Sequence, residues 1–437
     1  MGKILNKKIL IWIDDSSYFQ YCIASLVQEQ VNCKVYAVAD VNENSKKFLQ
    51  NQTFVKFEKI WFLRDHVYLQ NFKPNTDYLE KFEETYKINL WVVAHSERLF
   101  FKYNAYHKFS RDEILSIIEK ECHLYEEVLK ELKPDFLFIK YTDLHQNHLL
   151  LELAKSLKIH ILTLAPTKLG NSCHISQEQE KIDQTNDLTE ISEKDISEKL
   201  QNYLKFNDPY IKDMQKKISE KITNKKRISL LNQLFPKTNT LEYKNYYGNF
   251  GKTVPKIIII QLQSMLKNYF RKQFLNKNAI KNTSYEKIIF FPLHLEPDRA
   301  TLINSPFYTD QLDIIFNIAK SLPTGYKLFV KEHGSQSLLM WKKTSFYKKI
   351  LSIPNVELVH PSMNPKKMLE QCKLVITIAG TTGLEALFYN KPVIIMTDAT
   401  YSSMPGVFRI NHITELPEVI RTALSTKIDD SGAKEMI

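Results

Sequence analysis

The chain of 437 residues has few glycines, no CxxC pair and no long apolar run. Its ten glycines are few enough that each is expected where the backbone needs one. The five cysteines are scattered, which argues against a zinc site and a disulfide framework and fits a reducing cytosol. The apolar runs of the chain, such as residues 9–13, 90–94 and 257–260, are far shorter than the roughly 20 residues that span a bilayer. The sequence therefore predicts no transmembrane helix.

The first residues carry no targeting signal that we recognise. The apolar run after MGKILNKK lasts only about five residues before two aspartates, which is too short for the core of a signal peptide. Residue 6 is Asn, where an N-myristoylation signal needs Ser or Thr. We therefore expect a cytoplasmic protein, either soluble or peripheral at the inner face of the cell membrane.

The first part of the chain alternates strand and helix patterns, and its length predicts more than one core. Strands are expected in the short apolar runs ILIWID, KVYAVAD, KIWFLRD, NLWVVAH, FLFIKY and HILTLAP. The clearest helical patterns cover residues 111–133 and 147–158. Strands that alternate with helices predict a parallel sheet with helices on both faces. We expect this first domain to comprise residues 1–176.

A polar and then basic insert follows over residues 177–283. Residues 177–200 are polar and acidic without a dependable period, which is typical of a surface loop. From residue 212 to residue 281 there are sixteen Lys or Arg against three acidic residues, so this stretch carries the basic excess of the chain. Helices are expected within it at residues 210–222 and 256–275.

The alternation then resumes and predicts a second doubly wound domain over residues 284–427, with a flexible tail at 428–437. The expected strands are KIIFFPL, KLFVKEH, VELV, KLVITIA and KPVIIM, and the expected helices are QLDIIFNIAKSL, PKKMLEQC, GLEALFYN and LPEVIRTALS. The fold class is thus α/β, with two Rossmann-like domains that face a cleft. This matches the GT-B architecture of glycosyltransferases and of the non-hydrolysing UDP-sugar epimerases, but fold analogy does not fix a function.

The strongest chemical signal is AGTTG, which follows a buried strand and opens a helix. The free N–H groups at such a helix start bind anions, and Gly380 and Gly383 would let the backbone approach a phosphate. Thr381 and Thr382 add hydroxyl donors, and Glu385, expected in the first helical turn, would accept hydrogen bonds from ribose hydroxyls. The structural alternative is a threonine N-cap, a glycine turn and a glutamate that complements the helix dipole.

A second signal is KLFVKEHG, where alternation along a strand places Lys331 and His333 on one face and Glu332 on the other. A lysine and a histidine at the carboxyl end of a strand suit a diphosphate or a leaving nucleotide. The alternative is an ordinary strand end with a solvated lysine and a capping histidine.

The third signal is FFPLHLEPDRAT, in which two prolines stiffen a segment dense in polar side chains. Glu296 or Asp298 could deprotonate an acceptor hydroxyl or attack an anomeric carbon. His294 and Arg299 could hold a sugar carboxylate or a phosphate. The alternative is a surface loop with an internal ion pair. We favour catalysis because all three signals fall at predicted strand ends of one domain.

With these motifs, residues 287–397 resemble the capsule polysaccharide biosynthesis family, GT-B-type proteins similar to the Kdo transferases of capsule assembly, and a looser resemblance covers most of the remaining chain. It implies a glycosyltransferase that moves a sugar from a nucleotide-activated donor to a surface polysaccharide or lipid-linked acceptor. It also implies that His333 contacts the nucleotide and that residues 296–298 form the carboxylate motif. The motif here is Glu-Pro-Asp rather than Gln-Pro-Glu-Asp, and Gly334 replaces the usual Pro, so which carboxylate acts stays open.

The resemblance implies that the first domain holds the acceptor. Asp14 and Asp15 follow its first strand, and Asp143 and His145 follow FLFIKY, so we place these four on the acceptor side. The segment SERLFFKYN fits a surface turn and a contact with the acceptor equally well. GT-B enzymes as a class need no metal for chemistry, so we expect neither a metal nor a cofactor, the nucleotide-sugar being a substrate.

Three interpretations of the basic segment remain: a nucleic-acid site, a solvated helical face, or a surface for anionic membrane. No known nucleic-acid-binding pattern is present, so we expect no nucleic acid as a partner. Its apolar and basic helical stretch fits a peripheral enzyme on anionic lipid equally as well as a solvated face. Two other functions also stay open, a nucleotide-sugar epimerase and a non-catalytic binding subunit of polysaccharide assembly.

Overall fold

The computed structural model describes residues 6–16, 18–67, 72–166, 173–181, 183, 246–282, 284–333, 336 and 342–428. The helix predicted over residues 210–222, most of the polar loop of residues 177–200, Gly334 and the tail from residue 429 lie outside the described residues. The described residues form two compact units, which divide within one long helix between Ile257 and Ile258.

The first unit is built on a six-stranded sheet of order β3-β2-β1-β4-β5-β6. Its strands are β1 (Lys8–Asp14), β2 (Lys34–Asp40), β3 (Phe57–Phe62), β4 (Phe136–Lys140), β5 (His160–Pro166) and β6 (Cys173–Ser176). All neighbours pair in parallel except β6, which runs antiparallel to β5. The register pairs the last residues of β1 and β2, Asp14 and Asp40.

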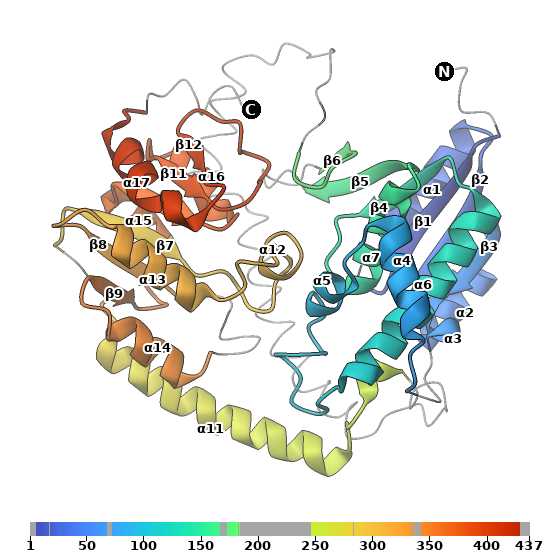
Figure 1. The fold of residues 1–437 in the computed structure, drawn as a ribbon, viewed down its shortest axis with the longest axis horizontal. Helices are drawn as coiled ribbons and strands as arrows, with labels where there is room; N and C mark the ends of the chain where they lie inside the picture. Colours follow the sequence, from blue (N-terminus) through green and yellow to red (C-terminus); the bar gives the residue numbers. More distant parts are fainter. Residues whose placement is uncertain are drawn as a thin grey trace. The chain divides into compact units, whose positions relative to one another are not determined.

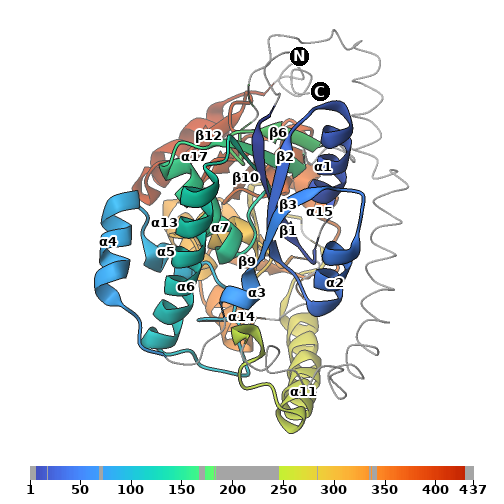
Figure 2. The ribbon, with the colours of Figure 1, turned by 90° about the vertical axis from the view of Figure 1, so that its right-hand side faces the viewer.

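Helices cover both faces of this sheet. Successive residues of a strand point to opposite sides, so a strand that is apolar throughout needs a core on each face. Leu10 and Trp12 of β1 belong to one core cluster, and Ile11 and Ile13 belong to another. Figure 2 shows α1 and α2 on one side of the sheet and α4, α5 and α6 on the other. The helices are α1 (Phe19–Gln30), α2 (Glu43–Asn51), α3 (Leu63–His66), α4 (Thr76–Tyr86), α5 (Leu90–His95), α6 (Arg111–Leu132) and α7 (His145–Ser156), with a 3-10 turn at Tyr247–Asn249.

The second unit holds another six-stranded sheet, of order β12-β11-β10-β7-β8-β9, in which all neighbours are parallel (Figure 1). Its strands are β7 (Ile288–Pro292), β8 (Lys327–Lys331), β9 (Val356–Val359), β10 (Leu374–Thr377), β11 (Val393–Ile395) and β12 (Val407–Arg409). The four inner strands β7, β8, β10 and β11 are buried along nearly their whole length, as expected for a parallel sheet covered on both faces.

The helices of the second unit that follow β7 are α12 (Arg299–Leu302), α13 (Gln311–Ser321), α14 (Thr344–Leu351), α15 (Pro365–Gln371), α16 (Thr381–Leu387) and α17 (Leu416–Ser425), with a 3-10 turn at Ile413–Glu415. All of these helices except the short α12 contribute to one of two core clusters on the two faces of the sheet. The long helix α11 (Val254–Asn278) precedes β7, and its Leu275 packs into one of these clusters. The predicted doubly wound α/β class is therefore confirmed for each unit.

Local predictions were wrong in a few places. The run NLWVVAH, predicted as a strand, is helix α5, whose N-cap Asn89 accepts a hydrogen bond from the N–H of Val92 at 3.0 Å. The run KIWFLRD is a strand only as far as Phe62 and then turns into α3. Strands β6 and β12 were not predicted, being only four and three residues long. Within the described part of the chain, no helix is both long enough and apolar enough to cross a bilayer.

Candidate functional site

The order of strands places one topological switch point in each sheet. In the first sheet the chain moves from β1 outward to β2 and β3, and then returns to place β4 on the other side of β1. In the second sheet it moves from β7 to β8 and β9, and then returns to place β10 on the other side of β7. In such sheets a ligand binds beyond the carboxyl ends of the two strands at the reversal. The residues that follow β1 and β4, and those that follow β7 and β10, are therefore the first candidates.

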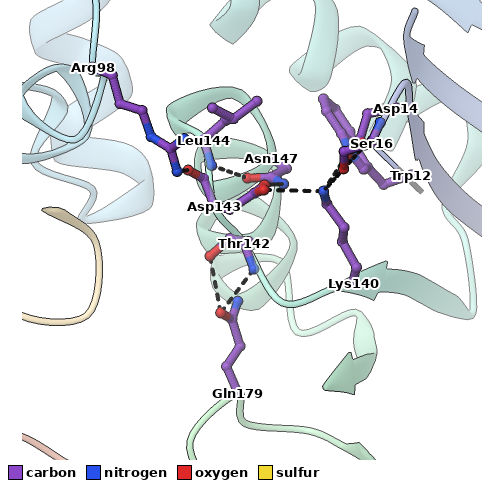
Figure 3. A network of polar contacts seen from close by, with 10 residues as sticks. All are labelled: Trp12, Asp14, Ser16, Arg98, Lys140, Thr142, Asp143, Leu144, Asn147 and Gln179. Carbon is purple, nitrogen blue, oxygen red and sulfur yellow. Dashed lines mark hydrogen bonds and ion pairs between the residues drawn. The ribbon is translucent and has the colours of Figure 1, made fainter. Parts of the chain in front are cut away.

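At the first switch point, Lys140 joins the two central strands (Figure 3). Its Nζ lies 2.9 Å from Oδ2 of Asp14 at the end of β1 and donates a hydrogen bond of 2.6 Å to Oγ of Ser16. It also donates to Oδ2 of Asp143 at 3.3 Å. Asp14 is held by the Trp12 indole N–H at 2.9 Å and by the N–H of Ser16 at 2.9 Å. One ammonium group thus orders both loops that leave the centre of the sheet.

The charges of this network stabilise one another. Burial raises the pKa of Asp14, but the Lys140 ammonium and the hydrogen bonds from Ser16 and Trp12 outweigh burial, and the net pKa lies below its usual value. Burial lowers the pKa of Lys140, but Asp143 and Asp14 outweigh it and the net pKa is raised. Both groups are therefore charged at neutral pH.

Asp143 is held in place from three sides. The Asn147 amide donates to its Oδ1 at 3.2 Å, and the Arg98 guanidinium donates to its backbone oxygen at 3.1 Å (Figure 3). About a quarter of its side chain remains exposed. Of the acceptor-side residues predicted from sequence, Asp14 and Asp143 are brought together here, with Lys140 between them.

Asp15 belongs to a neighbouring ion-pair group. Its Oδ2 accepts the N–H of Asn42 at 2.9 Å and lies 3.7 Å from the guanidinium of Arg64. Arg64 also donates to Oδ1 of the buried Asp40 at 2.8 Å and lies over the ring of Tyr246. Asp15 is exposed, so it borders the switch point without joining the Lys140 network.

His145 lies elsewhere, in the interior of the first unit. It is fully buried, with Nδ1 bonded to Oε2 of Glu97 and Nε2 3.0 Å from Oε1 of Glu121. Burial lowers the pKa of His145, but the two carboxylates outweigh it and raise the pKa to about 10. The structure does not bring this side chain together with Asp14 and Asp143. Glu97 is buried as well, so the surface-turn reading of its segment is wrong at that residue.

At the second switch point, His294 follows β7 and its ring contacts the end of the neighbouring strand β10. Its Nε2 accepts the N–H of Ile378 at 3.3 Å and lies 3.1 Å from Oγ1 of Thr377, the last residue of β10. The backbone of His294 is fixed by Gln311, which accepts its N–H at 2.7 Å and donates to its oxygen at 3.2 Å. Because Nε2 is an acceptor, the ring proton sits on Nδ1 when the imidazole is neutral.

The two carboxylates of the Glu-Pro-Asp motif have different surroundings. Glu296 is buried, accepts a 2.5 Å hydrogen bond from the Gln311 amide and lies 3.8 Å from Nζ of Lys342. Asp298 is half-buried and forms the N-cap position of α12 without a side-chain capping bond. Among the described residues, no hydrogen bond or ion pair reaches the Asp298 carboxylate. Asp298 is thus the more available of the two, and Arg299 follows it as the first residue of α12.

Lys331 ends β8 next to β7 and is 4% exposed. Its Nζ donates to the backbone oxygens of Glu332 at 3.3 Å and Pro361 at 3.2 Å. Within the described residues no carboxylate forms an ion pair with this ammonium. Burial lowers its pKa, and the charge of Glu332 opposes that shift only in part. Glu332 is instead bonded to the Tyr347 hydroxyl at 2.5 Å and lies 3.3 Å from Lys342. A buried ammonium that contacts only carbonyl oxygens is suited to an anion.

His333 follows Glu332 and is exposed. The protein atoms around its ring lower its pKa, while the carboxylates of Glu332 and Asp298 oppose that shift. His333 and Asp298, predicted from separate motifs, are therefore near enough to influence each other. Lys331 and His333 thus differ, because the first is enclosed and the second is open to solvent.

The AGTTG segment forms a tight turn into α16. Gly380 is the N-cap, and its N–H donates to Oγ1 of Thr377 at 3.1 Å, while neither Thr381 nor Thr382 caps the helix with its side chain. A Cβ at Gly380 would lie 2.8 Å from that same oxygen and 3.1 Å from the His294 ring. A Cβ at Gly383 would collide with the hydroxyl of Tyr401. Packing therefore accounts for both glycines.

Glu385 lies one turn further than expected. The helix begins at Thr381, so Glu385 is its fifth residue rather than part of its first turn. Burial raises the pKa of this half-buried carboxyl to about 7, and no described residue forms a hydrogen bond or ion pair with it. It is therefore available to a ligand, as the ribose prediction requires.

Sequence reasoning missed several residues that organise these sites, namely Lys140, Gln311, Gln336, Lys342 and Thr377. Gln336 is one example, since it accepts the N–H of Glu296 at 2.9 Å and donates to its oxygen at 2.8 Å. Lys140 had a detectable signal. It is the last residue of a buried strand, where a lysine is unusual unless a carboxylate or a ligand compensates its charge.

Comparison with known proteins gives one family and several distant structures. The family model described as capsule polysaccharide biosynthesis protein matches residues 193–426. No protein with a curated description matches the chain. Similar solved structures include the beta Kdo 2,4 transferase KpsC of Thermosulfurimonas dismutans, at 11% identity over 72% of this chain and 84% of that one, with a TM-score of 0.33.

Two further structures cover more of the chain. The beta Kdo 2,7 transferase KpsC of the same organism is 13% identical over 80% of this chain and 86% of that one, with a TM-score of 0.32. The UDP-GlcNAc 2-epimerase of Neisseria meningitidis, bound to UDP-GlcNAc, is 13% identical over 98% and 97%, with a TM-score of 0.29. At such identities and TM-scores these likenesses carry no conclusion about activity.

Proposed function

The chain belongs to the capsule polysaccharide biosynthesis protein family, and from this premise we propose that it is a glycosyltransferase. It would move a sugar from a nucleotide-activated donor to a surface polysaccharide or lipid-linked acceptor, in the cytoplasm or at the inner face of the cell membrane. The second unit would bind the donor, and the first unit would bind the acceptor.

The observation that carries this proposal is the set of groups at the switch point of the second sheet. His294 fixes the ends of β7 and β10, and Lys331 places a buried ammonium at the end of the neighbouring strand β8. An ammonium that lacks a carboxylate partner among the described residues favours the phosphates of a nucleotide. The exposed His333 would donate to the leaving phosphate, and Glu385 would accept hydrogen bonds from the ribose.

Asp298 is the group we assign to the reacting hydroxyl or to the anomeric carbon. Its carboxylate is open to a substrate, whereas that of Glu296 is occupied by Gln311 and lies close to Lys342. We therefore assign Glu296 a positioning role, in which it holds the loop that carries Asp298. Fixed charges that are placed where negative charge develops on the leaving nucleotide stabilise the transition state.

The test measures donor binding first and turnover second. Purified protein is melted with CMP, CDP, UDP, GDP or dTDP, because a ligand that binds only the native state raises the melting temperature. One nucleotide is expected to stabilise the wild type but not Lys331→Met, while Lys320→Met serves as the matched surface control. If no nucleotide stabilises the wild type, the donor assignment is wrong.

Turnover is then followed with the matching nucleotide-sugar. Asp298→Asn is expected to lower kcat at least 100-fold without changing the melting temperature, and Glu296→Gln to lower the melting temperature as well. Product from the donor alone, with no acceptor, would identify an epimerase. Binding without turnover on any glycan or lipid-linked acceptor would identify a non-catalytic binding subunit.

A further inference from the structure

Helix α11 exposes a continuous apolar face. The following large apolar side chains of this helix are exposed: Val254, Ile258, Ile259, Leu262, Met265, Leu266, Tyr269 and Phe270. Met265 is 68% exposed and Phe270 is 65% exposed, far more than the side chains of a core helix. Isolated exposed apolar residues need no explanation, but eight within one helix do.

The spacing of these residues places them side by side. Ile258, Leu262, Met265 and Tyr269 follow one another at intervals of four, three and four, which is the repeat of one helical face. The remaining members lie next to that row, and the rings of Tyr269 and Phe270 are 5.6 Å apart. The result is one wide apolar stripe over about four turns of the helix.

The opposite side of the helix packs against the second unit, so the stripe faces away from that unit. Arg271 is buried and donates to the backbone oxygen of Lys342 at 3.0 Å. Leu275 and Ala279 are buried in the core of the second unit. Rotation of the helix to hide the stripe would remove Leu275 from that core and leave the guanidinium without its carbonyl.

The charged residues of the segment that carries the stripe are all basic. Residues 246–282 contain seven Lys or Arg and no Asp or Glu. Lys267, Lys272 and Lys277 of α11 are exposed, and so are Lys348 and Lys349 on α14, the helix that follows Lys342. An apolar stripe on a helix whose charged residues are all basic complements a bilayer of anionic lipid, which is anionic at its headgroups and apolar beneath them.

We propose that this face of α11 docks the protein on an anionic lipid bilayer. The helix lies in the plane of the interface, with its apolar stripe among the acyl chains and its lysines against the headgroups. Long lysine side chains reach the headgroup level while their stems contribute apolar area. The proposal concerns a surface apart from the two switch points and does not rest on the proposed sugar transfer.

The test is co-sedimentation of the full chain with vesicles. Wild type is expected to pellet with vesicles of phosphatidylglycerol and phosphatidylcholine at least fivefold more than with phosphatidylcholine alone, and less at 0.5 M than at 0.1 M salt because exposed charges are screened. The stripe variant Leu262→Gln/Phe270→Gln is expected to lose at least five-sixths of this binding. The control variant Phe307→Gln/Phe316→Gln, which removes exposed apolar residues elsewhere in the second unit, is expected to bind as wild type does.

A second variant keeps the test independent of any folding defect in the stripe variant. Lys267→Gln/Lys272→Gln leaves the apolar stripe intact and is expected to lose the preference for anionic vesicles, while Lys320→Gln/Lys373→Gln is expected to retain it. Absence of wild-type binding to anionic vesicles would overturn the proposal. So would a concentration-dependent dimer in light scattering that the stripe variant abolishes without vesicles present, because a second copy of the chain would then cover this face.

Discussion

A single lysine and a single histidine hold the centres of the two sheets. Lys140 contacts oxygens that follow both strands at its switch point. His294, which follows β7, contacts the end of β10 through Nε2 at the other. The flexible ammonium has three donors and can serve three oxygens at once, whereas the imidazole accepts at one nitrogen and keeps the other for a further partner. Replacement of either group therefore disturbs loops from two strands.

The Lys140 network gives a prediction for stability at the residue scale. Lys140→Met leaves the carboxylates of Asp14 and Asp143 without their cation, and we expect a loss of about 3–5 kcal/mol in the free energy of unfolding because Asp14 is buried. Urea denaturation measures it. The control is Lys7→Met, whose ammonium pairs with the partly exposed Asp135, where about 0–1 kcal/mol is expected. Equal losses in the two variants would contradict the role of Lys140.

At the scale of the element, α16 begins where two glycines permit close packing. The hydroxyl of the buried Tyr401 donates to the backbone oxygen of Gly380 and lies against Gly383. The helix start is therefore fixed by a side chain from a later loop rather than by a threonine cap. Its geometry depends on the absence of a Cβ at Gly383.

This arrangement predicts a coupling between two substitutions. Gly383→Ala should lower the free energy of unfolding by about 1–3 kcal/mol, since the new methyl group overpacks the helix start. In a Tyr401→Phe background the missing hydroxyl makes room, so the same alanine should cost at least about 0.5 kcal/mol less. A double-mutant cycle by urea denaturation measures the difference. Strict additivity would show that Tyr401 is not the group that restricts this glycine.

Helix α5 shows why one element was misjudged from sequence. A short apolar run reads equally well as a buried strand or a buried helical turn, and NLWVVAH has only five consecutive apolar residues. Asn89 settles the matter by capping the helix, and Leu90, Val93 and Ala94 are then buried at helical spacing. The asparagine before the run was the signal in favour of a helix.

At the scale of the whole molecule, strand ends were predictable but strand neighbours were not. Alternation identified most strands of both sheets, and so it located Asp14, Asp143 and His294 correctly at carboxyl ends. The strand order, which makes β1 adjacent to β4, depends on long-range pairing that no local pattern encodes. The pairing of Lys140 with Asp14 could not be predicted for that reason, although a lysine at the end of a buried strand was itself a signal. His145 was placed on the acceptor side, although the first turn of α7 points its ring inward to Glu97 and Glu121.

The buried histidine makes the stability of the molecule depend on pH. Because the folded pKa of His145 is raised to about 10, its contribution to stability is fully present below the unfolded pKa near 6.5 and is lost as the pH rises toward 10. Each pH unit within that window withdraws up to about 1.4 kcal/mol. We therefore expect unfolding in urea to require less denaturant at pH 9 than at pH 7.

The variant His145→Gln isolates this effect from other titrating groups. Glutamine can donate one hydrogen bond to a glutamate but carries no charge, so the variant should be less stable at pH 7 and should lose less stability between pH 7 and pH 9 than wild type. Nitrogen chemical shifts of labelled histidine report the ring directly and should show a doubly protonated imidazole at pH 8. A ring that titrates near 6.5, or an unchanged slope in the variant, would mean that the two glutamates do not hold the imidazolium. The imidazole would then be neutral, and the proton would lie on a carboxyl group of Glu97 or Glu121.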